Sequence, residues 1–136
     1  GNSPGHLSIG GNYVQSGTML AELGGYEQGV SYDWIEVDGT ATLGGTLDIN
    51  WFGGFWGHGP FIVLTAAGGI TNDDLSGLTI DGSGATYGEH AWRATIVELG
   101  GQAEGLQLEL VPEPLTLLAL GSSLAGLGGY LRRRRR

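Results

Sequence analysis

Three histidines, His6, His58 and His90, are the side chains of this 136-residue chain best suited to bind a transition metal or to transfer a proton near neutral pH. They lie far apart in the sequence, and each stands beside Gly or Glu. The spacings that characterise zinc sites are missing, and the chain has 0 cysteines. The sequence therefore predicts solvated loop histidines, with no metal site and no cofactor.

Carboxylates are the second group of side chains that could catalyse a reaction or bind a metal ion. Asp33, Glu36, Asp38 and Asp48 could lie on one face, and a suitably separated pair can hydrolyse a glycosidic bond. However, Asp38 precedes a glycine, a pair typical of turns, and Asp48 alternates with apolar residues as in a half-buried strand. We interpret these residues as structural and predict that the chain is not an enzyme. Calcium could bind acidic loops, but neither the EF-hand nor the Gly-Gly-x-Gly-x-Asp pattern occurs.

An aromatic run lies before the middle of the chain. It contains Trp51, Phe52, Phe55, Trp56 and His58, interspersed with Gly53, Gly54, Gly57 and Gly59. Aromatic rings on a loop can stack on sugars or contact a membrane or a partner, and they can also fold back over the end of a small core. We favour the second interpretation, in which the run caps the core.

Short strands separated by turns must position these residues. The 28 glycines separate runs of Val, Ile, Leu, Thr, Tyr and Trp, and several runs alternate between apolar and polar residues. The strands are expected at 7–9, 18–23, 34–37, 46–51, 61–66, 78–80, 92–99 and 106–111. No segment before Pro114 has a helical period of useful length, so residues 1–111 are predicted to form a Gly-rich all-β domain.

The first half of this domain resembles the closing turns of autotransporter passenger regions. Residues 11–25 and 32–49 are two similar coils that both contain Leu-Gly-Gly, and residues 59–65 read Gly-Pro-Phe-Ile-Val-Leu-Thr. The resemblance, carried by residues 6–52, implies the end of a right-handed parallel β-solenoid. The last two expected strands suggest a short antiparallel cap, which a solenoid needs to cover its terminal coil. A β-sandwich is the alternative.

Charge is distributed unevenly along the chain. The net charge is −8; all but one of the 14 acidic residues precede residue 113, whereas Arg132 to Arg136 are all but one of the 6 basic residues. An acidic domain repels nucleic acid and anionic lipid, so we predict no nucleic-acid partner.

The C-terminal segment has the composition of a membrane helix. Residues 115–131 carry no charge and, as a helix, would span about 25 Å, close to the short limit for a bilayer core. The leucines expected to face the lipid are Leu115, Leu117, Leu118, Leu120, Leu124, Leu127 and Leu131. Five arginines, Arg132, Arg133, Arg134, Arg135 and Arg136, would hold its end in the cytoplasm by the positive-inside rule. An ordinary tail anchor fits these features as well.

Residues 112–136 as a whole resemble the PEP-CTERM sorting domain of Gram-negative bacteria. Pro112, Glu113 and Pro114 form the motif, and the apolar segment and arginine cluster follow in the family's order. The resemblance implies recognition of this motif by an exosortase, a transient partner, after anchoring in the inner membrane. It also implies later release to the cell surface or the extracellular matrix of a biofilm.

We therefore expect a fragment of a longer exported protein with a structural or adhesive role, and extracellular polysaccharide as a further partner. The alternative is an exported polysaccharide-binding or polysaccharide-cleaving protein whose active region lies upstream.

Overall fold

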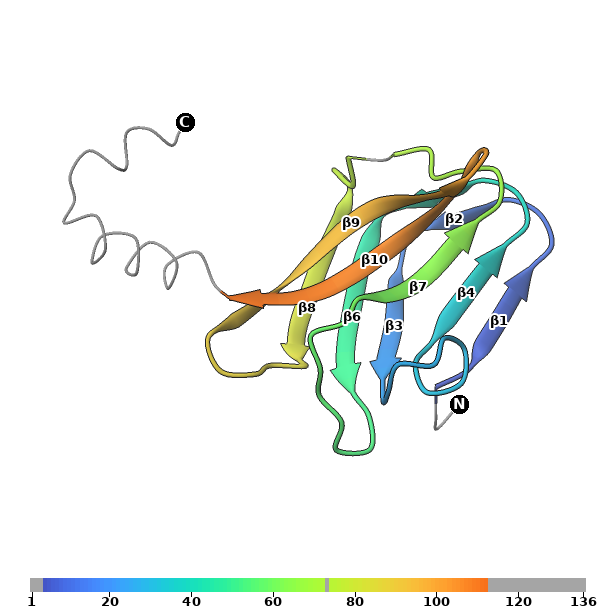
Figure 1. Ribbon diagram of the computed structural model, residues 1–136. Helices are drawn as coiled ribbons and strands as arrows, with labels where there is room; N and C mark the ends of the chain where they lie inside the picture. The colour runs from blue at the N-terminus through green and yellow to red at the C-terminus, as the bar shows by residue number, and fades with distance from the viewer. Residues whose placement is uncertain (1–3, 73, 113–136) are drawn as a thin grey trace.

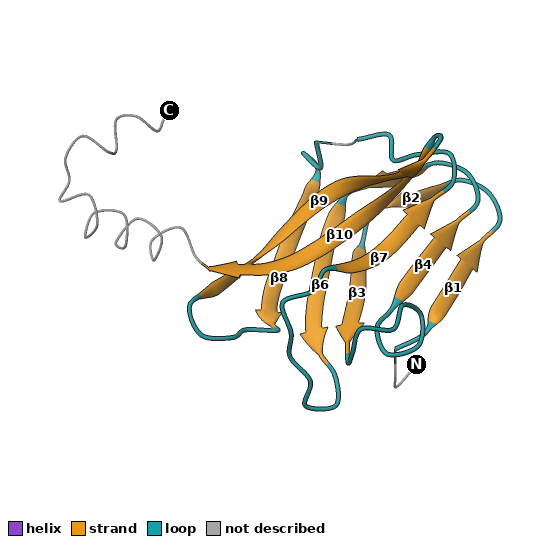
Figure 2. Ribbon diagram, viewed as in Figure 1, coloured by secondary structure: helices purple, strands orange, loops and turns teal. Residues whose placement is uncertain are grey.

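The computed structural model describes residues 4–72 and 74–112, and within these residues it contains strands, turns and loops but no helix (Figure 2). The prediction of an all-β domain is confirmed for this part of the chain. The strands are β1 (His6–Ile9), β2 (Tyr13–Gln15), β3 (Thr18–Leu23), β4 (Trp34–Val37), β5 (Ala41–Leu43), β6 (Gly45–Trp51), β7 (Phe61–Ala66), β8 (Leu78–Gly84), β9 (His90–Gly100) and β10 (Ala103–Pro112).

Strands β4 to β8 each pair in parallel with a strand about one coil earlier in the chain (Figure 1). β4 pairs with β1 and then β7 pairs with β4, while β6 lies between β3 and β8. β2 and β5 form a small two-stranded sheet between these two sets. Sequence analysis missed β2 and β5, because three residues are too few to show an alternating pattern.

The last two strands form a long antiparallel hairpin, which confirms the predicted pairing of these segments. β10 also pairs antiparallel with β7, so the largest sheet has the order β1-β4-β7-β10-β9 and is mixed. The sheets therefore differ from the regular parallel solenoid with a short cap that was predicted. The reason lies at Gly100 and Gly101, whose φ angles of 115° and 57° reverse the chain in a tight turn and return β10 along β7.

A single core connects the sheets, and in β3, β5, β6 and β10 it is built from alternate residues of the strand. Met19, Ala21 and Leu23 of β3 are buried, as the alternation in the sequence predicts. Leu106, Leu108 and Leu110 of β10 are buried in the same way. The largest fully buried side chains are Phe61, Leu23, Leu43, Leu47, Ile49, Leu64, Leu106, Leu108, Val37 and Val63.

A glycine makes the corner between β5 and β6 possible. Gly45 has φ of 69°, and a Cβ atom there would lie 2.0 Å from the carbonyl oxygen of Gly17 in the preceding coil. Gly44 and Thr46 on either side donate backbone hydrogen bonds to Gln15 and Gly17. Only glycine combines this backbone conformation with so close an approach between coils.

The predicted sorting and anchoring segment lies almost entirely outside the described residues. Pro112 is described: it is the last residue of β10 and is paired with His90. It therefore ends a strand, a position where its missing N–H is tolerated. Glu113, Pro114, the apolar segment 115–131 and Arg132 to Arg136 are outside the described part. In residues 4–72 and 74–112, no helix is long and apolar enough to cross a membrane.

Candidate functional site

Two of the three histidines, distant in the sequence, lie together in the structure. His58 is in the loop between β6 and β7, and His90 begins β9 after the loop that follows β8. Their ring centroids are 5.2 Å apart, with an angle of 56° between the ring planes. Because β6 and β8 are parallel neighbours, the loops that follow them meet at the same end of the sheet. His58 is an exposed loop residue, as predicted, whereas His90 begins a strand; the sequence did not predict that the two rings meet.

Two exposed aromatic rings complete this group. Trp56 and Tyr87 stack at 3.6 Å between ring centroids with an angle of 12°, although 42% of Trp56 and 39% of Tyr87 remain exposed. His58 meets the indole edge to face at 5.5 Å, and His90 lies 5.6 Å from the phenol ring. We call these four residues the Trp56 cluster.

The rest of the aromatic run covers the end of the core, as predicted. Phe55 contacts the buried Phe61 at 6.2 Å between ring centroids and Tyr26 at 5.3 Å. Trp51 packs against Trp92 at 5.5 Å and donates a hydrogen bond from Nε1 to the carbonyl oxygen of Thr86. The run thus has two parts: Trp51 and Phe55 cap the core, whereas Trp56 and His58 face outward in the Trp56 cluster.

His6 lies elsewhere, on β1. Its ring stacks on Trp34 at 4.1 Å with an angle of 6°, and its Nε2 lies 2.8 Å from a carboxylate oxygen of Glu36. Both side chains are well exposed, so this contact contributes little to stability.

The four carboxylates singled out from the sequence have separate, structural surroundings. Asp33 accepts backbone hydrogen bonds from Gly5 at 2.8 Å and Glu22 at 2.7 Å. Asp48 accepts one from the Asn50 side chain at 3.1 Å, and Asp38 follows β4 in a bend. These contacts support the interpretation of the acidic residues as turn and strand residues.

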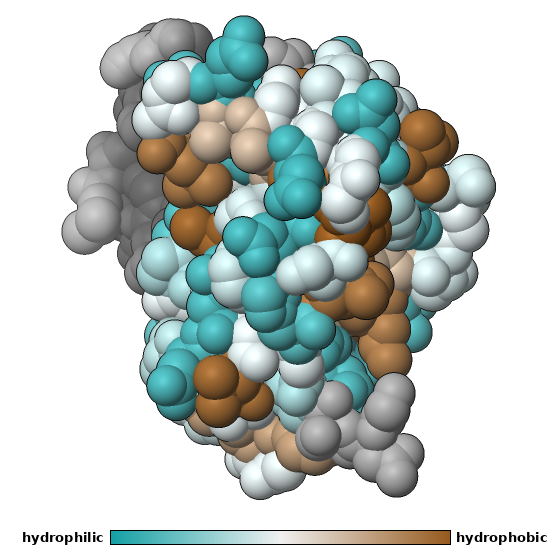
Figure 3. Space-filling view, turned by 90° about the vertical axis from the view of Figure 1, so that its right-hand side faces the viewer, coloured by the Kyte–Doolittle hydropathy of each residue, from teal (hydrophilic) through white to brown (hydrophobic). Residues whose placement is uncertain are grey.

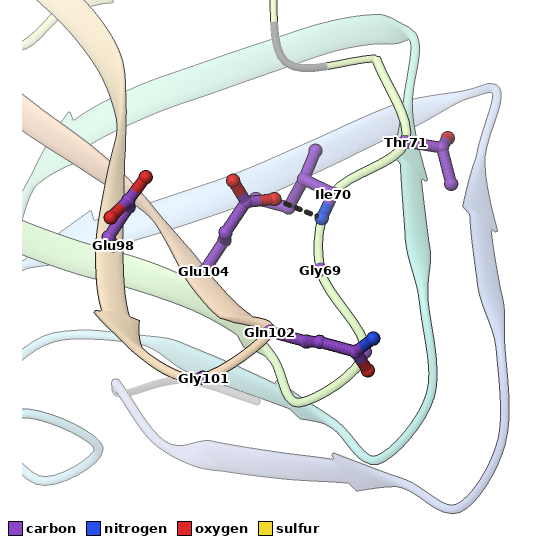
Figure 4. Close-up of a pocket in the computed structure, with 8 residues that line it drawn as sticks. Gly69, Ile70, Thr71, Glu98, Gly101, Gln102 and Glu104 are labelled. Atoms are coloured by element: carbon purple, nitrogen blue, oxygen red, sulfur yellow. Dashed lines mark hydrogen bonds between the residues drawn. The ribbon is translucent and has the colours of Figure 1, made fainter.

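A different carboxylate pair lines an open pocket of 310 Å³ (Figure 4). Glu98 and Glu104 stand opposite each other on β9 and β10, and a Glu104 oxygen accepts a hydrogen bond of 2.7 Å from the backbone N–H of Ile70. This bond ties the hairpin to the loop after β7. Across the described ranges 4–72 and 74–112, no three or more His, Asp or Glu side chains form a group that could hold a metal ion.

Three titratable groups have pKa values that differ from their ordinary ones. Burial raises the pKa of the Tyr13 phenol. Hydrogen bonds from the Ser83 hydroxyl and then from the Ser83 N–H hold the pKa of Asp81 below 3.8. Burial raises the pKa of the Tyr32 phenol, and the hydrogen bond from the Ile62 N–H partly opposes this rise. None of these three groups lies in the Trp56 cluster.

The side of the molecule that carries β1 has apolar residues between hydrophilic ones (Figure 3). Leu7 of β1 is 56% exposed, Val14 of β2 68% and Leu20 of β3 48%. β1 and β3 are edge strands of their sheets, and β2 pairs with β5 alone. The first coil therefore presents hydrogen-bonding edges and apolar side chains to solvent.

Comparison with known proteins finds a sequence similarity to an adhesin. It is similar to the adhesin BmaC autotransporter of Brucella suis biovar 1 (strain 1330), with 38% identity over 90 residues. The match covers 62% of this chain but 3% of that protein, so the chain spans a small part of its relative's length. No protein-family model matches the chain. No solved structure matches it either.

Proposed function

We propose that this chain is part of an exported bacterial surface protein whose role is structural or adhesive rather than enzymatic. The similarity to an autotransporter adhesin is the observation that carries this proposal. The acidic, cysteine-free composition and the all-β fold are consistent with it. In such a protein, the described domain would serve as a rigid terminal element, and the regions that bind other molecules would lie partly upstream.

In this proposal, the parallel-paired strands β1 to β8 are the part of the domain on which an upstream coil of the longer protein stacks. Strands β1, β2 and β3 are followed in parallel register by β4, β5 and β6, and then by β7, an isolated bridge at Ile70, and β8. The open edges and the exposed Leu7 of the first coil suit the stacking of a further coil. The β9–β10 hairpin closes the opposite end.

We further propose that residues 112–136 act as an exosortase-recognised sorting signal, with Pro112, Glu113 and Pro114 as the recognised motif. The protein would be held in the inner membrane of a Gram-negative bacterium and then transferred to the cell surface or the extracellular matrix. The order of motif, uncharged segment 115–131 and arginines supports this.

The intact mass of the mature protein in its native host tests both sorting and export. The wild type should lose the arginine-ended segment, whereas a variant with Pro112, Glu113 and Pro114 all changed to alanine should keep it. Retention of Arg136 and of inner-membrane location in both proteins would contradict sorting and indicate an ordinary tail anchor. If the wild type and the alanine variant were both recovered from the cytoplasm, that result would contradict export itself.

Binding of an extracellular polysaccharide is a second candidate function, favoured by the exposed Trp56 and Tyr87 rings. Aromatic rings supply apolar faces and polar tips for recognition, and the net charge of −8 favours a neutral polymer. Co-sedimentation with a neutral glucan should decrease on Trp56→Ala and persist on Trp34→Ala. Equal retention of both variants would contradict this role for the Trp56 cluster.

A further inference from the structure

His58 and His90 present the same nitrogen atom for binding. The Nδ1 of His58 lies 3.1 Å from the carbonyl oxygen of Leu110, and the Nδ1 of His90 lies 3.0 Å from that of Tyr87. A carbonyl oxygen can only accept a hydrogen bond, so each Nδ1 carries the proton and donates it. In the neutral ring, Nε2 then keeps its lone pair. This is the arrangement of metal-binding histidines, whose second nitrogen donates to a carbonyl or carboxylate.

The distance between the two rings suits one shared ion. Two imidazoles that bind a tetrahedral zinc ion at about 2.0–2.1 Å per Zn–N bond have their ring centres roughly 5 Å apart. The observed separation of the centroids is 5.2 Å, and the rings are inclined by 56° rather than stacked. This separation of the rings matches that expected for two imidazoles on one shared ion.

Both rings are held by their surroundings before any ion binds. His58 packs against Trp56, and its own carbonyl oxygen accepts a backbone hydrogen bond of 2.8 Å from Leu110. His90 packs against Tyr87 and is paired with Pro112 in the β9–β10 ladder. A preorganised pair loses less conformational entropy on binding than two free side chains would lose.

We propose that His58 and His90 bind one divalent transition-metal ion, such as Zn²⁺ or Cu²⁺, through their Nε2 atoms. Water fills the remaining positions, because residues 4–72 and 74–112 offer no third side chain of the usual ligand types in a group with them. Two imidazoles favour zinc and copper over magnesium and calcium, which prefer oxygen ligands. The ion links the loop after β6 to the start of β9, beside the end of β10. This proposal is independent of the proposed export.

Calorimetric titration of ZnCl₂ into the full 136-residue chain, free of any polyhistidine tag and kept soluble in detergent micelles, tests the site. We expect one equivalent of Zn²⁺ to bind, Cu²⁺ to bind more tightly, and Mg²⁺ to give no heat. His58→Ala and His90→Ala should each weaken zinc binding at least about tenfold. His6→Ala is the matched control and should leave the affinity unchanged.

A thermal unfolding series provides a second readout that does not depend on heats of binding. Saturating Zn²⁺ should raise the Tm of the wild type and of the His6→Ala variant, but not that of His58→Gln, which keeps a polar side chain. Far-ultraviolet circular dichroism checks that each variant is folded. Zinc binding that survives in the His58→Ala/His90→Ala double variant, or that disappears in His6→Ala, would overturn the proposal. So would the absence of any zinc binding at millimolar concentration.

Discussion

Asp33 and Glu36 show how much the role of a carboxylate depends on what surrounds it. Asp33 precedes β4 and accepts hydrogen bonds from the backbone N–H groups of Gly5 and Glu22, which belong to the preceding coil. Glu36 lies on the exposed face of β4 and pairs with His6. Asp33 therefore connects successive strands, whereas Glu36 makes a surface contact.

Replacement of these two residues should separate the two roles. Asp33→Ala leaves two backbone donors without their acceptor, and we expect the free energy of unfolding to fall by about 2–3 kcal/mol. Glu36→Ala removes an exposed ion pair and should change it by less than about 0.5 kcal/mol. Urea unfolding of both variants measures the difference. Equal effects would mean that Asp33 is not a structural contact.

Asp81 and Ser83 permit a prediction about protonation. Because the pKa of Asp81 is depressed in the folded chain, its contribution to stability is present above the ordinary value of 3.8 and is lost as the pH falls through the folded pKa. Ser83→Ala removes the hydroxyl that makes the largest contribution, so the pKa of Asp81 should rise toward 3.8. An NMR titration of the Asp81 carboxyl carbon measures this pKa. An unchanged pKa would show that the hydrogen bond from the Ser83 N–H alone lowers it.

At the scale of the elements, the turns determine which strands become neighbours. Gly45 allows β6 to lie directly beside β3, and Gly100 with Gly101 sends β10 back along β7. The alternation within β10 then places Leu106, Leu108 and Leu110 in the core. A strand's own pattern selects its buried face, and the turn before it selects the surface on which that face packs.

Replacement of Gly45 and of Gly17 by alanine tests whether the close approach of adjacent coils requires glycine. At Gly45, alanine requires a positive φ and contact with the Gly17 carbonyl oxygen, so we expect a loss of roughly 2–4 kcal/mol in the free energy of unfolding. At Gly17, a Cβ atom meets nothing within 4 Å, so alanine should be neutral or stabilise by up to about 1 kcal/mol. Chemical denaturation compares them. A Gly45→Ala variant as stable as Gly17→Ala would contradict the close approach of the coils.

At the scale of the whole molecule, the two ends of the stack differ. The first coil has open edges and exposes Leu7, Val14 and Leu20. The other end is closed by the hairpin, whose β10 strand lies between β7 and β9. The domain is therefore better secured at the end from which residues 113–136 continue than at the end where residue 4 enters.

Hydrogen exchange should follow this difference. Amides of β4, β6, β7 and β10, which are bonded to strands on both sides, should exchange most slowly, and those of β1 and β2 most rapidly. Mass spectrometry of exchanged peptides measures both. In a longer protein that carries a further coil before residue 1, protection of β1 and β2 should increase. If their exchange is as slow as that of β7 in the chain alone, the first coil does not lack a neighbour.

The amino-acid sequence was sufficient to predict the all-β class, the buried faces of β3, β6 and β10, and the antiparallel hairpin. These features depend on alternation and turn residues within a few positions of one another. The part of the aromatic run that caps the core was predicted for a similar reason: large apolar side chains beside a small core are driven to cover it.

Three features could be seen only in the folded chain: the mixed largest sheet, the contact of His58 with His90, and the stacking of Trp56 on Tyr87. His58 and His90 are brought together because β6 and β8 are parallel neighbours of one sheet, with β7 between them in the chain but in another sheet. No local pattern encodes such a pairing, since it depends on how the intervening coil closes and on where each turn directs the next strand.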